Sequence, residues 1–303
     1  MRLRLLLPAL ALTAVAATSC AAPDSKAPAA SSGTNGSKEV TTLSKDDAIA
    51  ASLPDTITSA GSVRVASGVS FPPMEFFDSD NKTVLGFDAD LGKALGQVLG
   101  VSFDFQNTNF DGIIGGLNAG RYDLSLTSMI DKKVRQESVD FVDYLNSGVT
   151  FMVAKGNPKG LKGQTDLCGV KVAVEKAATG DLVADDVSKE CQSAGKKPVD
   201  KQPFPDQASA VQALASGRAD AVMALDLTLA YNVKQDPKSF EVASKPIGAL
   251  PVGIVVPKSQ TQLRDAVQAA LKKVQESGAY DQLLAKWNLT DQALVGAPLN
   301  QGK

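Results

Sequence analysis

Short apolar or alternating stretches take turns with amphipathic ones from Val63 onward. Residues 63–67 have the pattern of a buried strand, 88–99 repeat leucine and valine on one helical face, and in 101–105 apolar and polar residues alternate. The same patterns predict strands over 122–126 and 252–256 and a helix with the apolar stripe Leu263, Val267, Leu271 and Val274. This alternation is typical of an α/β protein.

One βα unit recurs along the chain. Phe110-Asp111-Gly112 opens a helix that ends at Gly120-Arg121-Tyr122-Asp123, before a strand. Phe204-Pro205-Asp206-Gln207 opens a second helix, which ends at Gly217-Arg218-Ala219-Asp220 before another strand. The recurrence indicates two lobes built on similar units. Chance reuse of a common helix–glycine–strand corner is the alternative.

The N-terminus has the pattern of an export signal. Arg2 and Arg4 precede an apolar run, Leu5–Ala17, which gives way to small residues and Cys20. The run is too short to cross a hydrocarbon core of about 30 Å, and no later stretch is long and apolar enough. Ala17-Thr18-Ser19-Cys20 resembles a bacterial lipobox, so residues 1–20 are predicted to be a signal peptide with Cys20 as the lipidated residue. An ordinary secretory signal with an incidental cysteine is the alternative.

Residues 21–60 are predicted to be a flexible tether. Their first part, Ala21–Lys45, is rich in Ala, Ser, Gly, Thr, Pro and Lys and lacks aromatic residues, so it offers little surface to bury. A flexible chain of about 25 residues spans roughly 25–30 Å. Such a segment would hold a domain just off a membrane.

Composition excludes several classes of protein. A length of 303 residues favours two domains. A net charge of −2, with both signs interspersed, leaves no large basic surface, so nucleic acid is not expected as a partner. The chain has no histidine, which removes Ser-His-Asp and Cys-His catalysis and histidine metal sites. We therefore expect no hydrolase or zinc enzyme, no cofactor and no metal.

Cys168 and Cys191 are the two cysteines beyond the N-terminal region. An exported protein meets an oxidising compartment, so we predict that they form a disulfide worth about 3 kcal/mol. Two separate buried thiols are the alternative.

Five motifs follow one another between about Gly61 and Leu289. They are Ser70-Phe71-Pro72-Pro73-Met74-Glu75-Phe76, Gly86-Phe87-Asp88-Ala89-Asp90-Leu91, Phe110-Asp111-Gly112 with Gly120-Arg121-Tyr122-Asp123, Arg135-Gln136-Glu137-Ser138-Val139-Asp140-Phe141, and Gly278-Ala279-Tyr280-Asp281 with Lys286-Trp287. In this order and spacing they resemble the extracellular solute-binding proteins of bacterial ABC importers, in the polar amino acid-binding family (family 3).

The resemblance implies a two-lobed, periplasmic-binding-protein-like (type II) α/β fold with a ligand cleft between the lobes. Lobe one would combine 61–148 with 251–303, and lobe two would be 149–250. Ligand would close the hinge between them by contacting both lobes. The resemblance further implies a monomeric lipoprotein, anchored to the cell membrane outside the cytoplasm. It would capture a small polar solute, an amino acid above all, and pass it to an ABC permease with its ATPase.

Arg135 is the expected cation of the site. Its planar guanidinium can bind a carboxylate through two parallel hydrogen bonds, and it matches the family arginine with this role. A surface arginine that pairs with Glu137 or Asp140 is the alternative.

Further ligand contacts in lobe one come from two places. The resemblance places Thr127 and Ser128, with Met129 beside them, around the polar atoms of the ligand at the end of the 122–126 strand. It places Phe71 and Phe110 against the aliphatic part of the ligand. Ordinary core packing of these phenylalanines is the alternative.

In lobe two the resemblance is weaker. Thr179 stands at a helix start where relatives meet a carboxylate with backbone N–H groups. The position of the ammonium-binding aspartate holds Leu225, with Asp226 one place later, so either the strand end is shifted or this contact is lost. Lys176 is expected to add positive charge if it points inward, and a solvated lysine is the alternative.

These features carry a prediction about the ligand. Relatives that select cationic amino acids have aspartate where this chain has Gly68, so the pocket is expected to lack an acceptor for a basic side chain. If Lys176 also points inward beside Arg135, ligands with a neutral or acidic side chain are expected to bind better than lysine or arginine. The competing functions are an enzyme on the same fold, dehydratase-like, and a ligand-sensing receptor subunit. The missing histidine argues against the enzyme.

Overall fold

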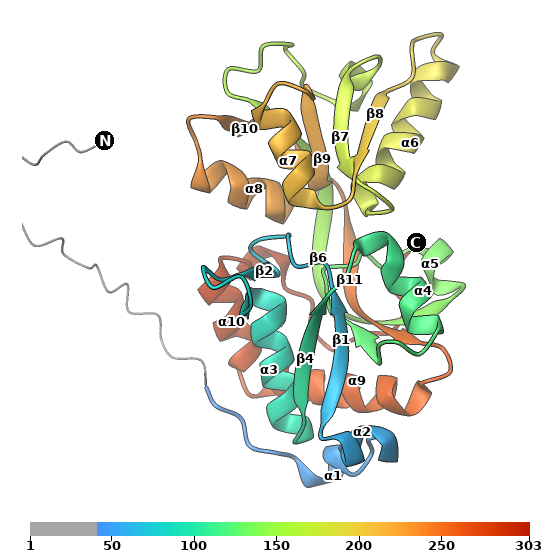
Figure 1. Cartoon of the computed structure of the whole chain (residues 1–303), viewed down its shortest axis with the longest axis vertical. Coiled ribbons are helices and arrows are strands. Elements are labelled where there is room, and N and C mark those ends of the chain that lie inside the picture. Colours follow the sequence, from blue (N-terminus) through green and yellow to red (C-terminus); the bar gives the residue numbers. More distant parts are fainter. Residues whose placement is uncertain (1–40) are drawn as a thin grey trace, which may run out of the picture. The chain divides into compact units, whose positions relative to one another are not determined.

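The computed structural model describes residues 41–303, and within them one mixed sheet of nine strands runs through the molecule. The strand order is β4-β1-β5-β11-β6-β9-β7-β8 with β10 beside β6, and a separate small sheet pairs β2 with β3 (Figure 1). The strands are β1 (Ser62–Ser67), β2 (Phe76–Phe77), β3 (Val84–Leu85), β4 (Ser102–Asn107), β5 (Leu124–Ser125), β6 (Val139–Ala154), β7 (Lys171–Glu175), β8 (Asp200–Phe204), β9 (Ala221–Leu225), β10 (Phe240–Val242) and β11 (Ile247–Pro257). The helices are α1 (Asp47–Ala50), α2 (Asp55–Ala60), α3 (Phe87–Leu99), η1 (Phe110–Gly112), α4 (Ile113–Asn118), α5 (Lys133–Gln136), η2 (Gln164–Leu167), α6 (Thr179–Ser193), α7 (Gln207–Ala215), α8 (Asp226–Gln235), α9 (Thr261–Glu276), α10 (Ala279–Trp287) and η3 (Thr290–Gln292).

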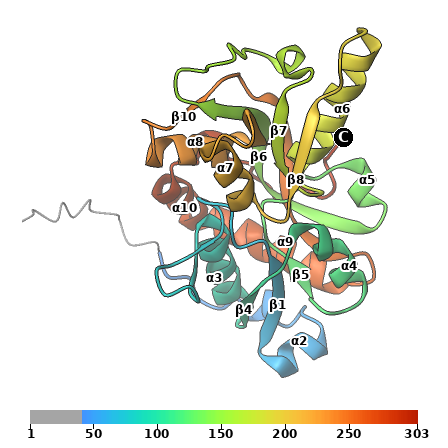
Figure 2. The ribbon, with the colours of Figure 1, turned by 45° about the horizontal axis from the view of Figure 1, so that its top comes forward.

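Two long strands, β6 and β11, join the two halves of this sheet. β6 pairs with β11 from Val139 to Val149 and with β9 from Val149 to Val153. β4, β1 and β5 lie on one side of the β6–β11 pair, and β9, β7 and β8 lie on the other (Figures 1 and 2). The predicted two-lobed α/β fold is therefore confirmed. The predicted lobe boundaries, after 148 and after 250, stay our working division, since the strand partners change there.

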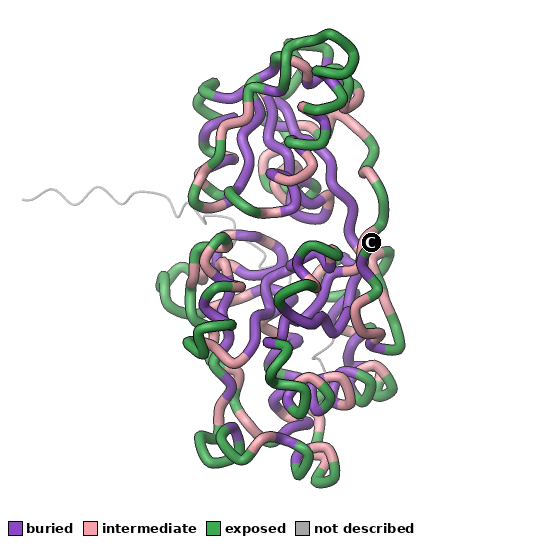
Figure 3. Tube along the Cα trace, turned by 90° about the vertical axis from the view of Figure 1, so that its right-hand side faces the viewer, coloured by how far each residue is buried: buried purple, intermediate pink, exposed green. Residues whose placement is uncertain are grey.

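Helices cover both faces of the sheet in lobe one. The alternation along β1 sends Val65 to the face under α3 and α9, and Ala66 to the face under α4. The predicted apolar stripes are fully buried, as Leu95 of α3 and Leu271 of α9 illustrate, and full burial of one such side chain contributes roughly 2 kcal/mol. Figure 3 colours the Cα trace by burial and shows long stretches of buried residues, in purple, inside the molecule.

Lobe two repeats this two-faced packing. Val172 and Val174 of β7 face the α6 side, whereas Ala173 between them faces α7. A disulfide joins Cys168, after η2, to Cys191 near the end of α6, 23 positions later. The predicted disulfide is thus confirmed. Closing a loop of this length lowers the conformational entropy of the unfolded chain, which stabilises the folded state by about 3 kcal/mol.

The recurring glycine–aspartate corners have one structural role in both lobes. Gly120 and Gly217 adopt φ of +69° and +71°, the left-handed conformation that ends a helix at low cost on glycine. Asp123 then accepts the main-chain N–H of Arg64 at the start of β1, and Asp220 accepts that of Lys171 at the start of β7. The corners are therefore equivalent parts of two similar βα units, as predicted.

The predicted tether ends earlier than expected. Residues 47–60 contain α1 and α2, with Asp46 as the N-cap of α1, and the side chains of Leu53 and Ile57 are buried in the core of lobe one. The prediction of a flexible segment to residue 60 is wrong for this part, because Leu53 and Ile57 pack against the hydrophobic core of lobe one. Residues 1–40, with the predicted signal peptide, Cys20 and most of the tether, lie outside the described residues. Between Thr41 and Lys303 no helix has the length and apolar character needed to cross a membrane.

Candidate functional site

A small cavity lies where strands of both lobes end. Thr127 and Ser128 follow β5, while Glu175 and Leu225 end β7 and β9. The carboxyl ends of neighbouring parallel strands form the usual crevice for ligands in open α/β sheets. The lining residues are Gly68, Phe71, Glu75, Phe110, Thr127, Ser128, Glu175, Ala178, Thr179 and Leu225.

The loop that presents Phe71 and Glu75 is held by the start of α3. Gly86 has φ +129°, and a Cβ at this residue would lie 2.0 Å from the carbonyl oxygen of Met74. Only glycine allows this approach, which lets the N–H of Asp88 donate to Met74 O at 2.9 Å. Two motifs that are separate in sequence therefore build one wall of the cavity.

Two carboxyl groups, those of Glu75 and Asp88, meet in or behind the cavity. Asp88 accepts hydrogen bonds from Tyr144 Oη at 2.7 Å and from the N–H of Ser128 at 2.9 Å, and Glu75 accepts from Thr127 Oγ1 at 3.0 Å. Burial and the neighbouring charge of Asp88 raise the pKa of Glu75 well above its usual value, and burial raises the pKa of Asp88 to about 6. Glu75 therefore holds its proton more tightly than an ordinary glutamate does.

Arg135 is a buried cation at the other end of the site. Its Nη1 donates to Ile130 O at 2.8 Å and to Thr179 Oγ1 at 3.3 Å, and its Nη2 donates to Ala177 O at 2.9 Å. Its Cζ lies 5.4 Å from the centroid of the Phe110 ring. Burial lowers the pKa of Arg135 to about 10, so it remains charged at neutral pH. The alternative of a surface arginine is excluded, since the residue is 6% exposed.

The start of α6 and the end of β7 form the wall in lobe two. Ala177 has φ +62°, a conformation that favours glycine, and its N–H donates to Asp181 Oδ2 at 2.8 Å, which stabilises the turn. Thr179 follows as the first residue of α6. Burial, then the charges of Asp206 and Asp111, raise the pKa of Glu175 to about 8. A second carboxyl group of the cavity is therefore protonated at neutral pH.

Three of the predicted ligand residues lie away from the cavity. Met129 packs into the core beside α4, because the alternation at the end of β5 turns its side chain inward. Lys176 is exposed and pairs with Asp111 of lobe one at 2.8 Å, so the predicted inward pose is wrong. Asp226 accepts from Ser147 Oγ at 2.6 Å and from the N–H of Gly148 at 3.2 Å, both on β6. Leu225 lines the cavity in its place.

The structure brings the other predicted ligand residues together. Five of them line the cavity: Phe71, Phe110, Thr127, Ser128 and Thr179. Arg135 reaches the cavity through its contacts with Thr179 and Phe110. Sequence reasoning missed Glu75, Asp88 and Glu175 as functional residues. A signal was present for Glu175: it ends an otherwise apolar run, Val172–Glu175, at the carboxyl end of a strand. No such pattern marks Glu75 or Asp88, since their burial depends on the loop folding over α3.

These groups make the cavity electrostatically selective. Two buried carboxyl groups, Glu75 and Glu175, face it together with aromatic walls, and one guanidinium lies at its edge. The prediction that the pocket lacks an acceptor for a basic side chain is therefore wrong. In residues 41–303 no group of three or more His, Cys, Asp or Glu side chains is arranged to hold a metal ion.

Two lobes on crossing strands, with a polar cavity at the strand ends, define a solute-binding protein of the two-lobed type. Residues 63–290 match the family described as bacterial extracellular solute-binding proteins, family 3, and the chain belongs to this family. The predictions of the family and of an extracytoplasmic solute-binding function are thereby confirmed.

Known proteins of similar sequence and structure agree with this family assignment. Arginine-binding protein ArgT of Corynebacterium glutamicum is 30% identical over 260 residues, which cover 83% of this chain and 84% of that protein. A solved ancestral arginine-binding protein, bound to arginine, is 34% identical with a TM-score of 0.70, covering 75% of this chain and 98% of its own. The ancestral amino acid-binding protein AncCDT-1, described as a precursor of cyclohexadienyl dehydratase, is 32% identical with a TM-score of 0.69, covering 77% and 98%. All three are described as binding proteins.

Proposed function

We propose that this protein captures an amino acid with a cationic side chain, such as L-arginine, for an ABC importer. One observation carries the proposal: a buried guanidinium, Arg135, lies against Thr179 and Phe110 of the cavity wall, and two buried carboxyl groups, Glu75 and Glu175, line the cavity. A cationic amino acid has one carboxylate and two positive groups, which complements this set. Relatives described as arginine-binding support the choice.

Charge complementarity also argues against the other classes of amino acid. A zwitterion with a neutral side chain supplies only one positive group, so one buried carboxyl group would keep its proton. An acidic ligand would place its side-chain carboxylate beside Glu75 and Glu175 and could form an ion pair with neither of them. The earlier preference for neutral or acidic ligands depended on an inward Lys176 and is replaced by this proposal.

Hinge closure of a monomer is the proposed capture mechanism. Contacts between the lobes surround the cavity: Arg135 with Thr179, Lys176 with Asp111, and Phe76 with Tyr231 at 6.4 Å between ring centroids. A ligand that contacts both lobes adds to these interactions only in the closed state, so it shifts the equilibrium toward closure.

Calorimetric titration tests the function. L-arginine is expected to bind with one site per chain and a Kd below about 10 μM, equivalent to roughly −7 kcal/mol. The matched control is L-citrulline, which has nearly the same shape but no side-chain charge, and it is expected to bind at least about tenfold more weakly. Small-angle scattering of the same samples is expected to show a monomer that becomes more compact with L-arginine.

Equal or tighter binding of L-citrulline would reject the cationic ligand, and no binding by any amino acid would reject the function. Chemical conversion of the ligand during the titration would instead favour the dehydratase-like enzyme. Co-purification with a permease and ATPase is expected for the importer, and its absence would favour the receptor subunit.

Anchoring through Cys20 is a further part of the proposal, supported by the lipobox-like segment. Cys20→Ser is expected to release the protein into the medium while leaving ligand binding unchanged, because the anchor is remote from the cavity in sequence. Immunoblots of membrane and medium fractions measure this. Membrane retention of the variant would contradict the anchor.

A further inference from the structure

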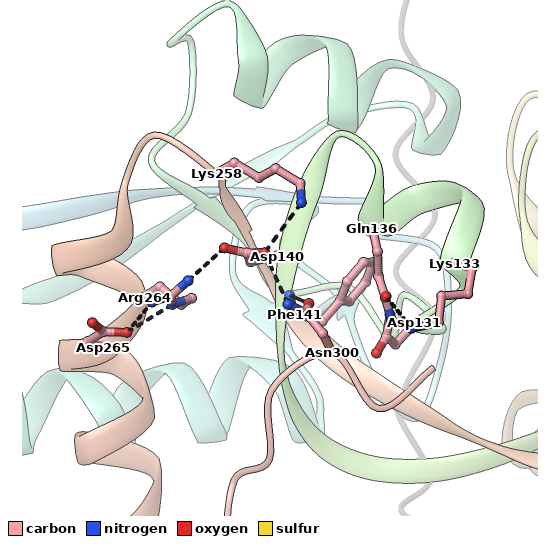
Figure 4. Close-up of polar contacts among 9 residues, drawn as sticks. All are labelled: Asp131, Lys133, Gln136, Asp140, Phe141, Lys258, Arg264, Asp265 and Asn300. Atoms are coloured by element: carbon pink, nitrogen blue, oxygen red, sulfur yellow. Dashed lines mark hydrogen bonds and ion pairs between the residues drawn. The ribbon is translucent and has the colours of Figure 1, made fainter. Parts of the chain in front are cut away.

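The segment that precedes the end of the described chain lies against the strand and loop that carry Arg135. Leu299 forms a bridge with Val142 of β6, and Asn300 accepts the N–H of Phe141 at 2.8 Å through its side chain while donating to Asp140 at 3.1 Å. Figure 4 shows Asn300 between these residues of β6, with Gln136 and Asp131 close by. Residues 299–302, here the clasp segment, are therefore attached to lobe one by specific hydrogen bonds.

The clasp segment reaches the arginine loop, residues 130–136, through one buried carboxylate. Asp131 is 0% exposed, and its Oδ2 accepts the N–H of Gly302 at 2.6 Å. Its Oδ1 accepts from Gln136 Nε2 at 2.7 Å, which closes the arginine loop on itself, and Gln136 Nε2 also lies 3.4 Å from Gly302 O. Asp131 thus links the clasp segment to both ends of the loop.

Besides the clasp segment, contacts with Lys303, with the core through Ile130 and with β11 hold the arginine loop in lobe one. Its only helix, α5, has four residues, which is too short to be stable alone. Two further attachments lead to β11: the N–H of Asp131 donates to Pro251 O at 2.8 Å, and Ile130 forms a bridge with Val252. Arg135 itself bonds to Ile130 O within the loop and to Ala177 and Thr179 in lobe two. The loop is therefore held between β11 and the clasp segment.

Gly302 has no room for a side chain at this junction. A Cβ on Gly302 would lie 2.2 Å from the carbonyl oxygen of Asp131 and 2.6 Å from its Cγ. Asp131 cannot move away from Gly302 without losing the hydrogen bond that its own N–H donates to Pro251 O. Any substitution at Gly302 must therefore displace either the clasp segment or the arginine loop.

We propose that the clasp segment, through Asn300, Gly302 and Asp131, positions Arg135 and thereby sets how well the site recognises the carboxylate of its ligand. The proposal rests on the proposed role of Arg135 in binding that carboxylate. These are positioning residues, since none of them lines the cavity. A guanidinium that must bind a carboxylate through two hydrogen bonds tolerates displacements of only about 0.5 Å. The negative charge of Asp131 also favours the charged form of Arg135 against the effect of burial.

Gly302→Ala tests the proposal, with Gly163→Ala as the matched control, because a Cβ at Gly163 meets nothing within 4 Å. The full chain is titrated with L-arginine and with L-argininamide, which lacks the carboxylate. We expect Gly302→Ala to weaken L-arginine binding at least about tenfold and to change L-argininamide binding by less than about threefold. Equal losses for both probes would mean general damage to the fold and would overturn the proposal, as would an unchanged affinity for L-arginine.

A ligand-free measurement separates this proposal from the proposed function. Hydrogen exchange of peptides covering 130–136 is expected to speed up in Gly302→Ala and to stay unchanged in Gly163→Ala, without any ligand present. If the wild-type protein does not bind L-arginine, the proposed function is rejected. Hydrogen exchange then still tests whether the clasp segment holds the arginine loop in place. Should Gly302→Ala not fold, Asn300→Ala removes two hydrogen bonds without a steric clash and is expected to show the same exchange. Unchanged exchange in the folded variant would overturn the proposal.

Discussion

Arg135→Ala is expected to abolish measurable binding of carboxylate ligands. Arg135 is buried beside Thr179 and the ring of Phe110, where its guanidinium is held against the cavity wall. Removing one partner of a buried charge pair costs about 2–5 kcal/mol or more, which is roughly a 30-fold to several-thousand-fold loss in affinity. Calorimetry with L-arginine measures the loss.

Two variants make this result interpretable. Arg218→Ala is the matched control, because Arg218 also lies over a phenylalanine ring, that of Phe204, but is exposed and remote from the cavity. It is expected to bind like the wild type. Arg135→Lys keeps the charge and loses the planar pair of donors, so an intermediate affinity is expected. Wild-type binding by Arg135→Ala would refute the assigned role.

Glu175→Gln is expected to weaken L-arginine binding by about tenfold to a hundredfold and to leave L-citrulline binding nearly unchanged. The reason is charge: the side-chain amide retains an acceptor oxygen and the size of the side chain but cannot pair with a cation, and a charge-assisted hydrogen bond is worth roughly 1.5–3 kcal/mol. Glu190→Gln, at an exposed position of α6, is the control. An equal loss for both ligands would argue against a role in charge selection.

The same variant is expected to remove much of the pH dependence of binding. The pKa of Glu175 is raised to about 8, by burial first and then by Asp206 and Asp111, while Glu75 also faces the cavity. At pH 6–7 a cationic ligand must displace the proton of Glu175, so affinity rises with pH and levels off above about 8. Calorimetry in buffers of different ionisation enthalpy is expected to detect proton release on L-arginine binding, and less of it in Glu175→Gln.

The unliganded protein is expected to respond to pH in the opposite direction. Because the folded pKa of Glu175 lies above the ordinary value of 4.5, the folded state holds a proton that the unfolded state has lost between these values. This contribution to the free energy of unfolding therefore falls as pH rises from about 4.5 to 8, by up to roughly 5 kcal/mol. Urea unfolding of Glu175→Gln is expected to lack that decline, and an identical pH profile would contradict the assignment.

Much of the fold follows from local patterns in the sequence. The helix over 88–99, the stripe from Leu263 to Val274 and the corners at Gly120 and Gly217 were predictable, because periodicity and helix-ending glycine act over a few residues. The site residues Thr127, Ser128 and Arg135 were instead selected by the resemblance to the family. A short loop gives no local sign that Arg135 is buried.

Tertiary structure alone decided which charges face the ligand. A change of one residue at the end of β9 turns Leu225 into the cavity and Asp226 toward β6, and the apolar–polar pattern does not determine where a strand ends to that accuracy. Lys176 and Glu175 are adjacent in sequence, yet one is exposed and the other buried, because Glu175 ends the buried strand β7 whereas Lys176 follows the strand and pairs with Asp111 at the surface. The sequence by itself thus determined the family, the two lobes and the guanidinium of the site. The pair of buried carboxyl groups, and with it the sign of charge that the ligand should carry, emerged only when distant segments packed together and removed those groups from water.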